Sequence, residues 1–492
     1  MQKRSMIIIG AGIAGLVTGC YAQMNGYQAQ ILERHDGPGG LCTSWTRKGY
    51  VLDGCIHHLA GASPASRYYP IWEELGTADL PMAFDDVFVR CEDPGGRAFS
   101  AYTDPDRLAE HLKERAPGDA RLIDEYVGGI RRFSKFEFLA LPLYRPMELI
   151  RLAPQLATAP RWMRVSLDDF ARRFEDPFLR RAFPRLQYGI PGVPMGVHLG
   201  FLAGCHNHTL GRPGVDSRSF ARAIEKRYRQ LGGEVHYGSE VDRVLVERDR
   251  AVGVRLATGS EVRADVIVSA ADGRTTIFEM LEGRYATGLI RSYYQGPPTD
   301  PQSFGVHVSL GVDQDLSGEP AALMIFMETA VQIAGLKRDH LNVEIYTGEA
   351  YAPPGKSVIM VPLDSAYDFW AKMVPDRGRY EQMKARDAEA VMGLLEDRFP
   401  GLQSRVEVVD VATPVTTERY TGNFHGMQPW PVPKGAVKVM IGGLSRTLPG
   451  LANFHMVGHW AEAMIGISTV ALSGRNLVRR LCKQEGRSFE TT

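Results

Sequence analysis

A glycine-rich turn near the N-terminus constrains this chain more than any other feature. The apolar run 6–9 is typical of a buried strand in a parallel sheet, and Gly10-Ala11-Gly12-Ile13-Ala14-Gly15 follows it directly. We expect Gly10 to allow a sharp turn and Gly12 to let a pyrophosphate approach the backbone. Gly15 would let the following helix, residues 13–25, pack close to the strand. The unpaired N–H groups at its N-terminus would bind phosphate.

An acidic residue supports this interpretation. Gly26 is expected to end the helix, and residues 28–32 form a second predicted strand that leads into Glu33. A carboxylate at this position accepts hydrogen bonds from the ribose hydroxyls of a dinucleotide. A lone G-x-G-x-x-G motif is a weak signal. The same motif between a strand and a helix, with an acid after the second strand, predicts a dinucleotide-binding fold.

The residues after Glu33 indicate which dinucleotide is bound. Arg34 is followed by Gly37-Pro38-Gly39-Gly40-Leu41-Cys42, whose second glycine pair brings more backbone close to a cofactor. This extension resembles the flavin-binding signature of the amine oxidase and phytoene desaturase superfamily. In that signature G-x-G-x-x-G is followed by E-R or E-A and then by G-G. The resemblance implies FAD, because a plain NAD dehydrogenase lacks the extension.

Three later blocks carry the same resemblance. Strands between 235 and 269 form a predicted meander that returns at Ala270 to the parallel sheet, and in these flavoproteins the adenine packs at the position of Val241. T-P-V-T-T-E-R-Y-T-G-N at 413–423 and the segment 448–475 are similar to blocks of bacterial phytoene desaturase-like oxidoreductases. The expected FAD contacts are Gly10, Gly12, Ile13, Ala14, Gly15, Glu33, Arg34, Gly39, Gly40, Leu41, Val241, Ala270, Gly458, Gly466 and Ile467.

The C-terminal block departs from the relatives at two places. Ala463-Met464-Ile465-Gly466 stands where they usually have Pro-Gly-Gly-Gly facing the flavin, and Ser468 stands where they often have proline. Met464 and Ile465 would narrow the space beside the ring. We therefore expect a substrate that is shorter than full-length phytoene or that enters end-on.

The fold class that follows is α/β. A Rossmann-like FAD-binding domain, with a doubly wound parallel sheet and a β-meander, is expected to be interwoven with a mixed-sheet substrate domain and a helical subdomain. Helices are expected at 104–138 and 167–183, with Pro and Gly breaks. The expected domains are FAD-binding at 1–90, 216–290 and 426–492, a helical and substrate subdomain at 91–215, and a substrate domain with the mixed sheet at 291–425.

Charge and cysteine content argue against other classes of protein. The 57 basic residues balance the 57 acidic ones, whereas a nucleic-acid binder usually has a basic excess. The six cysteines show no C-x-x-C spacing, and His206 and His208, only two residues apart, make a poor metal site, so we expect neither a disulfide framework nor a metal site. No signal peptide and no membrane-spanning run is visible. We expect a cytoplasmic protein with reduced cysteines.

The candidate catalytic residues are side chains that can move protons, because the flavin itself accepts the hydride. His57, His58, His459 and Glu462 fall in blocks expected to approach the isoalloxazine ring. Histidine titrates near neutrality. His57 and Glu462 are the first two candidates, and His459 is the third. For each residue the alternative is a structural, hydrogen-bonded role.

The stretch 136–165 combines apolar residues with arginines, and prolines break it into short pieces. Three interpretations stay open. The stretch could dip into a membrane surface, cap a buried substrate tunnel, or simply pack in the helical subdomain. The resemblance favours a peripheral membrane contact, since phytoene desaturases draw carotenoid from the bilayer.

The sequence favours an FAD-dependent desaturase, dehydrogenase or redox-neutral isomerase of an apolar isoprenoid or polyene, with hydride transfer to or from the flavin N5. A flavin amine or amino-acid oxidase is the alternative, with Trp430 and Trp460 as an aromatic pair framing the amine. A non-catalytic prenyl-binding escort protein is a second alternative. Such proteins degrade the phosphate loops, which are intact here.

Overall fold

The computed structural model describes residues 4–295, 301–426, 446–461 and 466–492. Four residues that the sequence singled out, Trp430, Glu462, Met464 and Ile465, lie outside these ranges, as does Ala463. The expected acid–base role of Glu462 and the expected narrowing of the flavin face therefore stay predictions.

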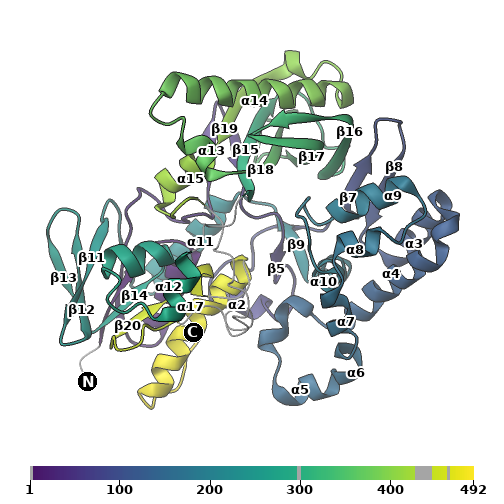
Figure 1. Ribbon diagram of the computed structural model, residues 1–492. Helices are drawn as coiled ribbons and strands as arrows, with labels where there is room; N and C mark the ends of the chain where they lie inside the picture. The colour runs from purple at the N-terminus through teal and green to yellow at the C-terminus, as the bar shows by residue number, and fades with distance from the viewer. Residues whose placement is uncertain (1–3, 296–300, 427–445, 462–465) are drawn as a thin grey trace.

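A five-stranded parallel sheet gathers three distant parts of the chain (Figure 1). Its order is β10-β2-β1-β14-β20, and every neighbouring pair is parallel. The predicted Rossmann-like sheet is thereby confirmed. Its strands are β1 (Ser5–Ile9), β2 (Gln28–Leu32), β10 (Glu234–His236), β14 (Val266–Ser269) and β20 (Phe454–Met456).

The two faces of this sheet bury alternate residues of β1. Met6 and Ile8 belong to the core shared with the helices, whereas Ile7 and Ile9 belong to the core shared with the predicted meander. Because successive side chains of a strand point to opposite faces, a fully apolar strand is required here. The helices are α1 (Ile13–Met24), α11 (Ser217–Gln230) and α17 (Ile467–Gln484), and the meander is β11 (Val241–Glu247), β12 (Arg250–Leu256) and β13 (Glu261–Arg263).

A second, mixed sheet of seven strands has the order β19-β15-β18-β17-β16-β7-β8. In it β16 and β7 pair in parallel, and the other neighbours are antiparallel. Helix α14 (Arg377–Arg398) lies across one face of it (Figure 1) and shares its buried core. The strands are β7 (Val87–Glu92), β8 (Ala98–Tyr102), β15 (Gln302–Val312), β16 (Ala322–Ile333), β17 (Leu336–Thr347), β18 (Ser357–Ser365) and β19 (Val406–Ala412).

A helical subdomain lies beside β7 and β8 in Figure 1. The expected helix 104–138 is divided at Pro117, and the segment after it is a chain of short helices. Among the described residues, no helix combines the length and the apolar character that crossing a bilayer requires. The helices are α3 (Pro105–Arg115), α4 (Ala120–Phe133), α5 (Pro146–Arg151), α6 (Ala153–Leu156), α7 (Ala159–Arg164), α8 (Leu167–Ala171), α9 (Pro177–Ala182) and α10 (Met195–His206), with the 3-10 turn η2 (Phe138–Leu143) before α5.

Short elements connect these layers. The hairpin β3–β4 follows the second glycine loop, and β5, β9 and β6 form a small three-stranded sheet in that order. The connecting elements are β3 (Ser44–Arg47), β4 (Tyr50–Asp53), β5 (Leu59–Ala60), β6 (Met82–Ala83), β9 (Leu210–Pro213), α2 (Tyr69–Glu74), α12 (Gly288–Gln295), α13 (Tyr367–Ala371) and α15 (Pro414–Thr421).

Helix α1 approaches β1 so closely that Gly15 has no room for a side chain. A Cβ at Gly15 would lie 2.0 Å from the Gly10 carbonyl oxygen. Gly19 is similarly close to Tyr228 on α11, at 2.7 Å. At the other end of the helix, Gly26 follows the C-cap residue Asn25 with a φ of +74°, as expected for a helix stop.

We predict that Gly15→Ala lowers the thermal unfolding temperature, because α1 must move away from β1. Overpacking of this kind costs ~1–3 kcal/mol or more. Gly393→Ala is the matched control, since Gly393 is an exposed mid-helix residue of α14 where an added methyl carbon would meet nothing within 4 Å. The control should be neutral or stabilising by up to ~1 kcal/mol. Equal unfolding temperatures for the two variants would contradict the close packing of α1.

Candidate functional site

The first glycine turn leaves an open N-terminus on helix α1. Gly10 has a φ of +97° and donates its N–H to the Leu32 carbonyl at 2.8 Å. Gly12 is the N-cap residue of α1, where no side chain caps the helix and no acidic residue lies in the first turn. The first N–H groups of a helix have no intrahelical acceptor. They are therefore available to an anionic group at this place.

The second glycine loop lies directly against the first. Gly39 donates its N–H to the Ala11 carbonyl at 2.9 Å, and Gly12 and Gly39 form an isolated parallel bridge. A Cβ at Gly40 would lie 3.4 Å from the Gly12 Cα. Leu41 follows in the same turn. The two loops thus form one surface of bare backbone, which fits the close approach of a pyrophosphate that the glycines predict.

Glu33 lies at the carboxyl end of β2 and is 8% exposed. Its carboxylate accepts hydrogen bonds from the Ala11 N–H at 2.6 Å and from the His35 N–H at 2.8 Å. Arg34 points toward Glu240 at 3.6 Å. Ser239 donates its N–H to the Glu33 carbonyl at 2.8 Å, and this contact brings the start of β11, with the buried Val241, beside the acid. The structure places these predicted contacts in one region.

The C-terminal block lies next to the first turn. Ala270 donates its N–H to the Ile9 carbonyl at 2.9 Å, and a Cβ at Gly458 would lie 3.5 Å from the Ala14 Cβ. Gly466, with a φ of +135°, is the N-cap of α17, which begins at Ile467 without a side-chain cap. The predicted cofactor residues therefore line the sheet's carboxyl edge, between two helices with open N-termini.

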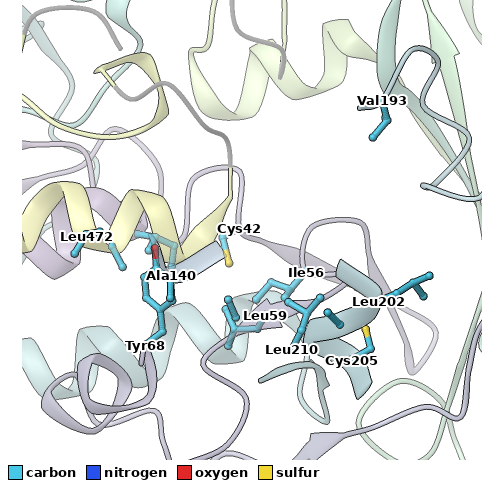
Figure 2. Close-up of a cluster of buried hydrophobic side chains, with 14 of the residues drawn as sticks. Cys42, Ile56, Leu59, Tyr68, Ala140, Val193, Leu202, Cys205, Leu210 and Leu472 are labelled. Atoms are coloured by element: carbon cyan, nitrogen blue, oxygen red, sulfur yellow. The ribbon is translucent and has the colours of Figure 1, made fainter. Parts of the chain in front are cut away.

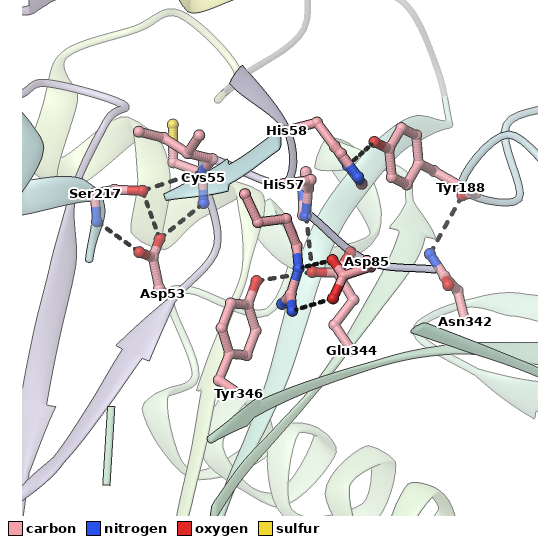
Figure 3. A network of polar contacts seen from close by, with 12 residues as sticks. Asp53, Cys55, His57, His58, Asp85, Tyr188, Ser217, Asn342, Glu344 and Tyr346 are labelled. Atoms are coloured by element: carbon pink, nitrogen blue, oxygen red, sulfur yellow. Dashed lines mark hydrogen bonds and ion pairs between the residues drawn. The ribbon is translucent and has the colours of Figure 1, made fainter. Parts of the chain in front are cut away.

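His57 lies in the layer between the parallel sheet and the seven-stranded sheet, where it forms a buried ion pair (Figure 3). Its Nδ1 lies 2.8 Å from Glu344 Oε2, and Tyr346 donates its hydroxyl to the same oxygen at 2.7 Å. Phe304 stacks on the imidazole with ring centroids 5.3 Å apart. Burial lowers the pKa of His57, but the adjacent Glu344 carboxylate outweighs burial, so the pKa is raised above 6.5.

Further polar side chains surround this pair. Tyr188 and His58 Nδ1 share a hydrogen bond of 2.6 Å, and burial lowers the pKa of His58 to about 4. Arg212 on β9 makes two contacts with Asp85, at 2.6 and 3.0 Å. Because a buried charge is expensive unless it is paired, these contacts explain why so many ionisable groups are accommodated in one layer.

The third predicted catalytic residue, His459, has a different environment. Its Nε2 is buried and has no hydrogen-bond partner among the described residues. Burial lowers its pKa to about 4. The imidazole packs against Trp460 with ring centroids 4.1 Å apart. His459 is therefore neutral near pH 7, and its free nitrogen can exchange a hydrogen bond with a bound group.

Sequence reasoning missed Glu344, Tyr346, Arg212, Asp85, Tyr188 and His307. His307 on β15 lies beside the cluster, and burial together with the charge of His57 lowers its pKa to about 4. The alternation of polar and apolar residues along β17 could have identified Glu344 and Tyr346 from the sequence. Asn342, Glu344 and Tyr346 alternate with apolar residues and so share one face of an otherwise buried strand.

Apolar side chains adjoin the polar cluster. Figure 2 shows Ile56, Leu59, Leu202, Cys205 and Leu210 gathered between β5, β9 and α10. A narrow cleft beside them is lined by residues of β5, η2 and α10, among them Ala60, Phe138 and the small residues Gly200, Ala203 and Gly204. An apolar cluster and a narrow cleft thus adjoin the polar cluster that contains His57 and His58.

Comparisons with known proteins agree with the motifs. Residues 8–75 match the family described as NAD(P)-binding Rossmann-like domain. A chloroplastic prolycopene isomerase of Daucus carota is 24% identical over 99% of this chain and 81% of its own length. An all-trans-retinol 13,14-reductase of Danio rerio is 23% identical over 84% of this chain and 75% of its own length. A neurosporene-forming phytoene desaturase of Rhodobacter capsulatus is 27% identical over 56% of this chain and 54% of its own length.

Solved structures show the same fold. A putrescine oxidase triple mutant superposes with a TM-score of 0.63 at 14% identity, covering 98% of this chain and 99% of that one. An oxidoreductase from Methanosarcina mazei superposes with a TM-score of 0.60 at 17% identity, covering 96% of this chain and 100% of that one. The predicted resemblance is confirmed: the chain is similar to prolycopene isomerase and phytoene desaturase, and it shares the fold of putrescine oxidase.

We predict that Gly12→Ala weakens binding of the expected cofactor FAD at least about tenfold, or ~1.4 kcal/mol. The new Cβ would meet only the Gly39 carbonyl oxygen, at 3.8 Å, so the protein without cofactor tolerates it. A pyrophosphate close to the backbone does not. The measurements are the FAD dissociation constant and the unfolding temperature of the cofactor-free protein, which should not change. An unchanged dissociation constant would show that no phosphate lies at Gly12.

Proposed function

We propose that this chain is an FAD-dependent oxidoreductase that desaturates, saturates or isomerises an apolar polyene. The observation that carries the proposal is the buried His57–Glu344 pair beside an apolar cluster, in the layer between the dinucleotide sheet and the mixed sheet. The relatives support the substrate class, because prolycopene, phytoene and all-trans-retinol are all polyenes.

FAD fits the residues that the two glycine loops bring together. The bare backbone at Gly12 and Gly40 would hold the pyrophosphate, and Glu33 would accept the ribose hydroxyls. The open N-terminus of α17, at Gly466 and Ile467, would donate N–H groups to the flavin and favour negative charge there. When bound, FAD supplies a two-electron acceptor or donor at its N5.

The role that we propose for His57 is proton transfer through Nε2. Glu344 occupies Nδ1 and, with its charge, favours the imidazolium. In the saturating or isomerising direction the imidazolium gives its Nε2 proton to a polyene carbon. In the desaturating direction the neutral imidazole accepts a proton at the same atom. Tyr346 fixes the carboxylate by donating to Glu344 Oε2, and Phe304 fixes the plane of the ring.

Trp460 does not favour the amine oxidase alternative. Its side chain is 4% exposed, and its Cβ and ring carbon pack on Gly273. An aromatic residue that frames an amine beside the flavin must present its ring face to the substrate. The likeness to amine oxidases at 14% identity concerns the fold alone.

We predict that His57→Gln lowers kcat about 100-fold, the usual loss when a proton-transfer residue is removed. If turnover needs the imidazolium, the wild-type rate should fall as pH rises through the raised His57 pKa, above 6.5. Glu344→Gln removes the group that raises this pKa, so the falling limb should move to lower pH. Glu349→Gln, at an exposed carboxylate after β17, is the control.

The raised pKa of His57 also predicts that the free energy of unfolding depends on pH. The ion pair stabilises the folded chain fully below the unfolded-state pKa of His57, and this contribution is lost as pH rises through the folded-state pKa. Histidine titration by NMR gives the pKa directly. Identical His57 titration curves in the wild type and in Glu344→Gln would exclude the proposed pairing.

The proposed membrane contact is the exposed face of α5. Met147 and Ile150 are 64% and 65% exposed, and Met163 on α7 is 41% exposed. Arg145 and Arg151 flank Met147 and Ile150 in the sequence. In Figure 1 this helix lies at the lower tip of the helical subdomain. Trp162, in contrast, is 4% exposed and packs toward Phe170, so it belongs to the core.

We predict that the protein floats with vesicles containing anionic lipid and that Met147→Ser with Ile150→Ser reduces the floated fraction several-fold. Each buried aliphatic side chain contributes ~1.5–3 kcal/mol. Val409→Ser, at a 47% exposed residue of β19, is the control and should float like the wild type. A wild type that stays entirely in the unbound fraction would rule out this surface as a membrane contact.

A further inference from the structure

Two of the six cysteines face each other beside the second glycine loop. The hairpin β3–β4 is antiparallel, and its pairing begins with Ser44 opposite Asp53. Cys42 lies two residues before Ser44 and Cys55 two residues after Asp53, so both cysteines lie at the open end of this hairpin. The Cys55 side chain neighbours the Cys42 thiol and is, after burial, the group that most raises its pKa. A disulfide requires Cβ atoms ~3.5–4.5 Å apart, and the turns that carry the two cysteines can adjust to this separation because neither cysteine is held in the strand ladder.

The pair is held in place at the N-terminus of α11. Cys42 donates its Sγ–H to the Ser217 carbonyl at 3.4 Å. Cys55 donates its N–H to Asp53 Oδ1 at 3.1 Å, and Asp53 in turn accepts the Ser217 N–H and hydroxyl at 2.6 and 2.7 Å. Figure 3 shows Cys55, Asp53 and Ser217 joined in this way. Both cysteines are therefore fixed to the same residue of the helix.

The remaining cysteines are in different environments. All six are free thiols. Cys20 donates to the Ile224 carbonyl and Cys482 to the Asn25 side chain, each inside the helical layer. Cys55 is partly exposed, whereas the other five are buried. A reagent in solution therefore meets Cys55 first.

We propose that Cys42 and Cys55 form a redox-modification site, a dithiol that a small-molecule disulfide converts to an intramolecular disulfide. The Cys55 thiolate attacks the reagent RSSR, one RSH leaves, and a mixed disulfide forms. Cys42 then loses its proton and attacks the Cys55 sulfur, and the second RSH leaves. The reagent gains the two electrons and two protons that the cysteines lose. Burial raises the pKa of Cys42, so loss of the proton from its thiol limits the rate of the second, intramolecular step.

The cross-link would tie the glycine loop to the turn that carries His57. Cys42 donates its N–H to the Gly39 carbonyl at 3.0 Å, and Gly39 bridges to Gly12 of the first loop. Cys55 lies two residues before His57. A disulfide therefore restrains the loop that, under the proposed function, lies over the cofactor. Oxidation should slow the release of FAD about tenfold, because a fixed loop opens less often.

Mass spectrometry tests the disulfide without reference to the flavin. The folded protein is treated with oxidised glutathione, the remaining thiols are alkylated, and trypsin cuts at Arg47 and Lys48. We expect peptide 35–47 linked to peptide 49–67, each of which contains one cysteine. Cys42→Ser should leave Cys55 as a glutathione adduct, and Cys20→Ser should still give the linked peptides. Full alkylation of both Cys42 and Cys55 after oxidation would overturn the proposal.

The rate of FAD release, measured on dilution of oxidised and reduced protein, tests the effect on the loop. Oxidised wild type should release FAD about tenfold more slowly, and Cys55→Ser should be insensitive to the oxidant. Linked peptides with unchanged FAD release would overturn the restraint on the loop. A protein that binds no FAD but forms the linked peptides would instead refute the proposed function and leave the redox site standing.

Discussion

The contact between helix α1 and strand β1 is the constraint on which the other parts of the structure depend. Gly15 lies so close to the Gly10 carbonyl that any Cβ would collide with backbone. This contact fixes the N-terminus of α1 at the carboxyl edge of the sheet, where parallel α/β sheets bind their ligands. The second glycine loop can then lie against the first, and Glu33 can hold the Ala11 N–H. The surface that is predicted to bind the dinucleotide is a consequence of this one close packing.

A second constraint is the buried charge between the two sheets. Glu344 lies on the mixed sheet and His57 on the turn after β4, and both are nearly enclosed, so neither would be tolerated as an unpaired ion. Their pairing holds His57 in one orientation and favours its protonated form. The glycine turns thus lie at the carboxyl edge of the parallel sheet and His57 in the layer between the two sheets, with apolar side chains between β5 and α10 beside it.

The sequence predicted those parts of the fold whose signals are local. The strand 28–32, the strands between 235 and 269 and the helix end at Gly26 agree with the structure, because turn residues mark their ends. Helix α10 was missed, since it is apolar on all sides and has no periodic pattern. Glu344 was missed for another reason. It meets His57 only through strand pairing and sheet packing over 287 residues of chain, and no local pattern encodes such a contact.

The proposed function requires that a flavin in this site transfers electrons to or from a polyene, or that it isomerises a double bond of the polyene. The most direct test is the absorption spectrum of the FAD-loaded protein under anaerobic conditions, recorded with oxidised and with reduced flavin. Polyenes in detergent micelles and primary amines are added in separate experiments. We predict that polyenes change the flavin band or their own vibronic bands, while amines leave both unchanged. Bleaching of the flavin by amines, with polyenes inert, would contradict the claim.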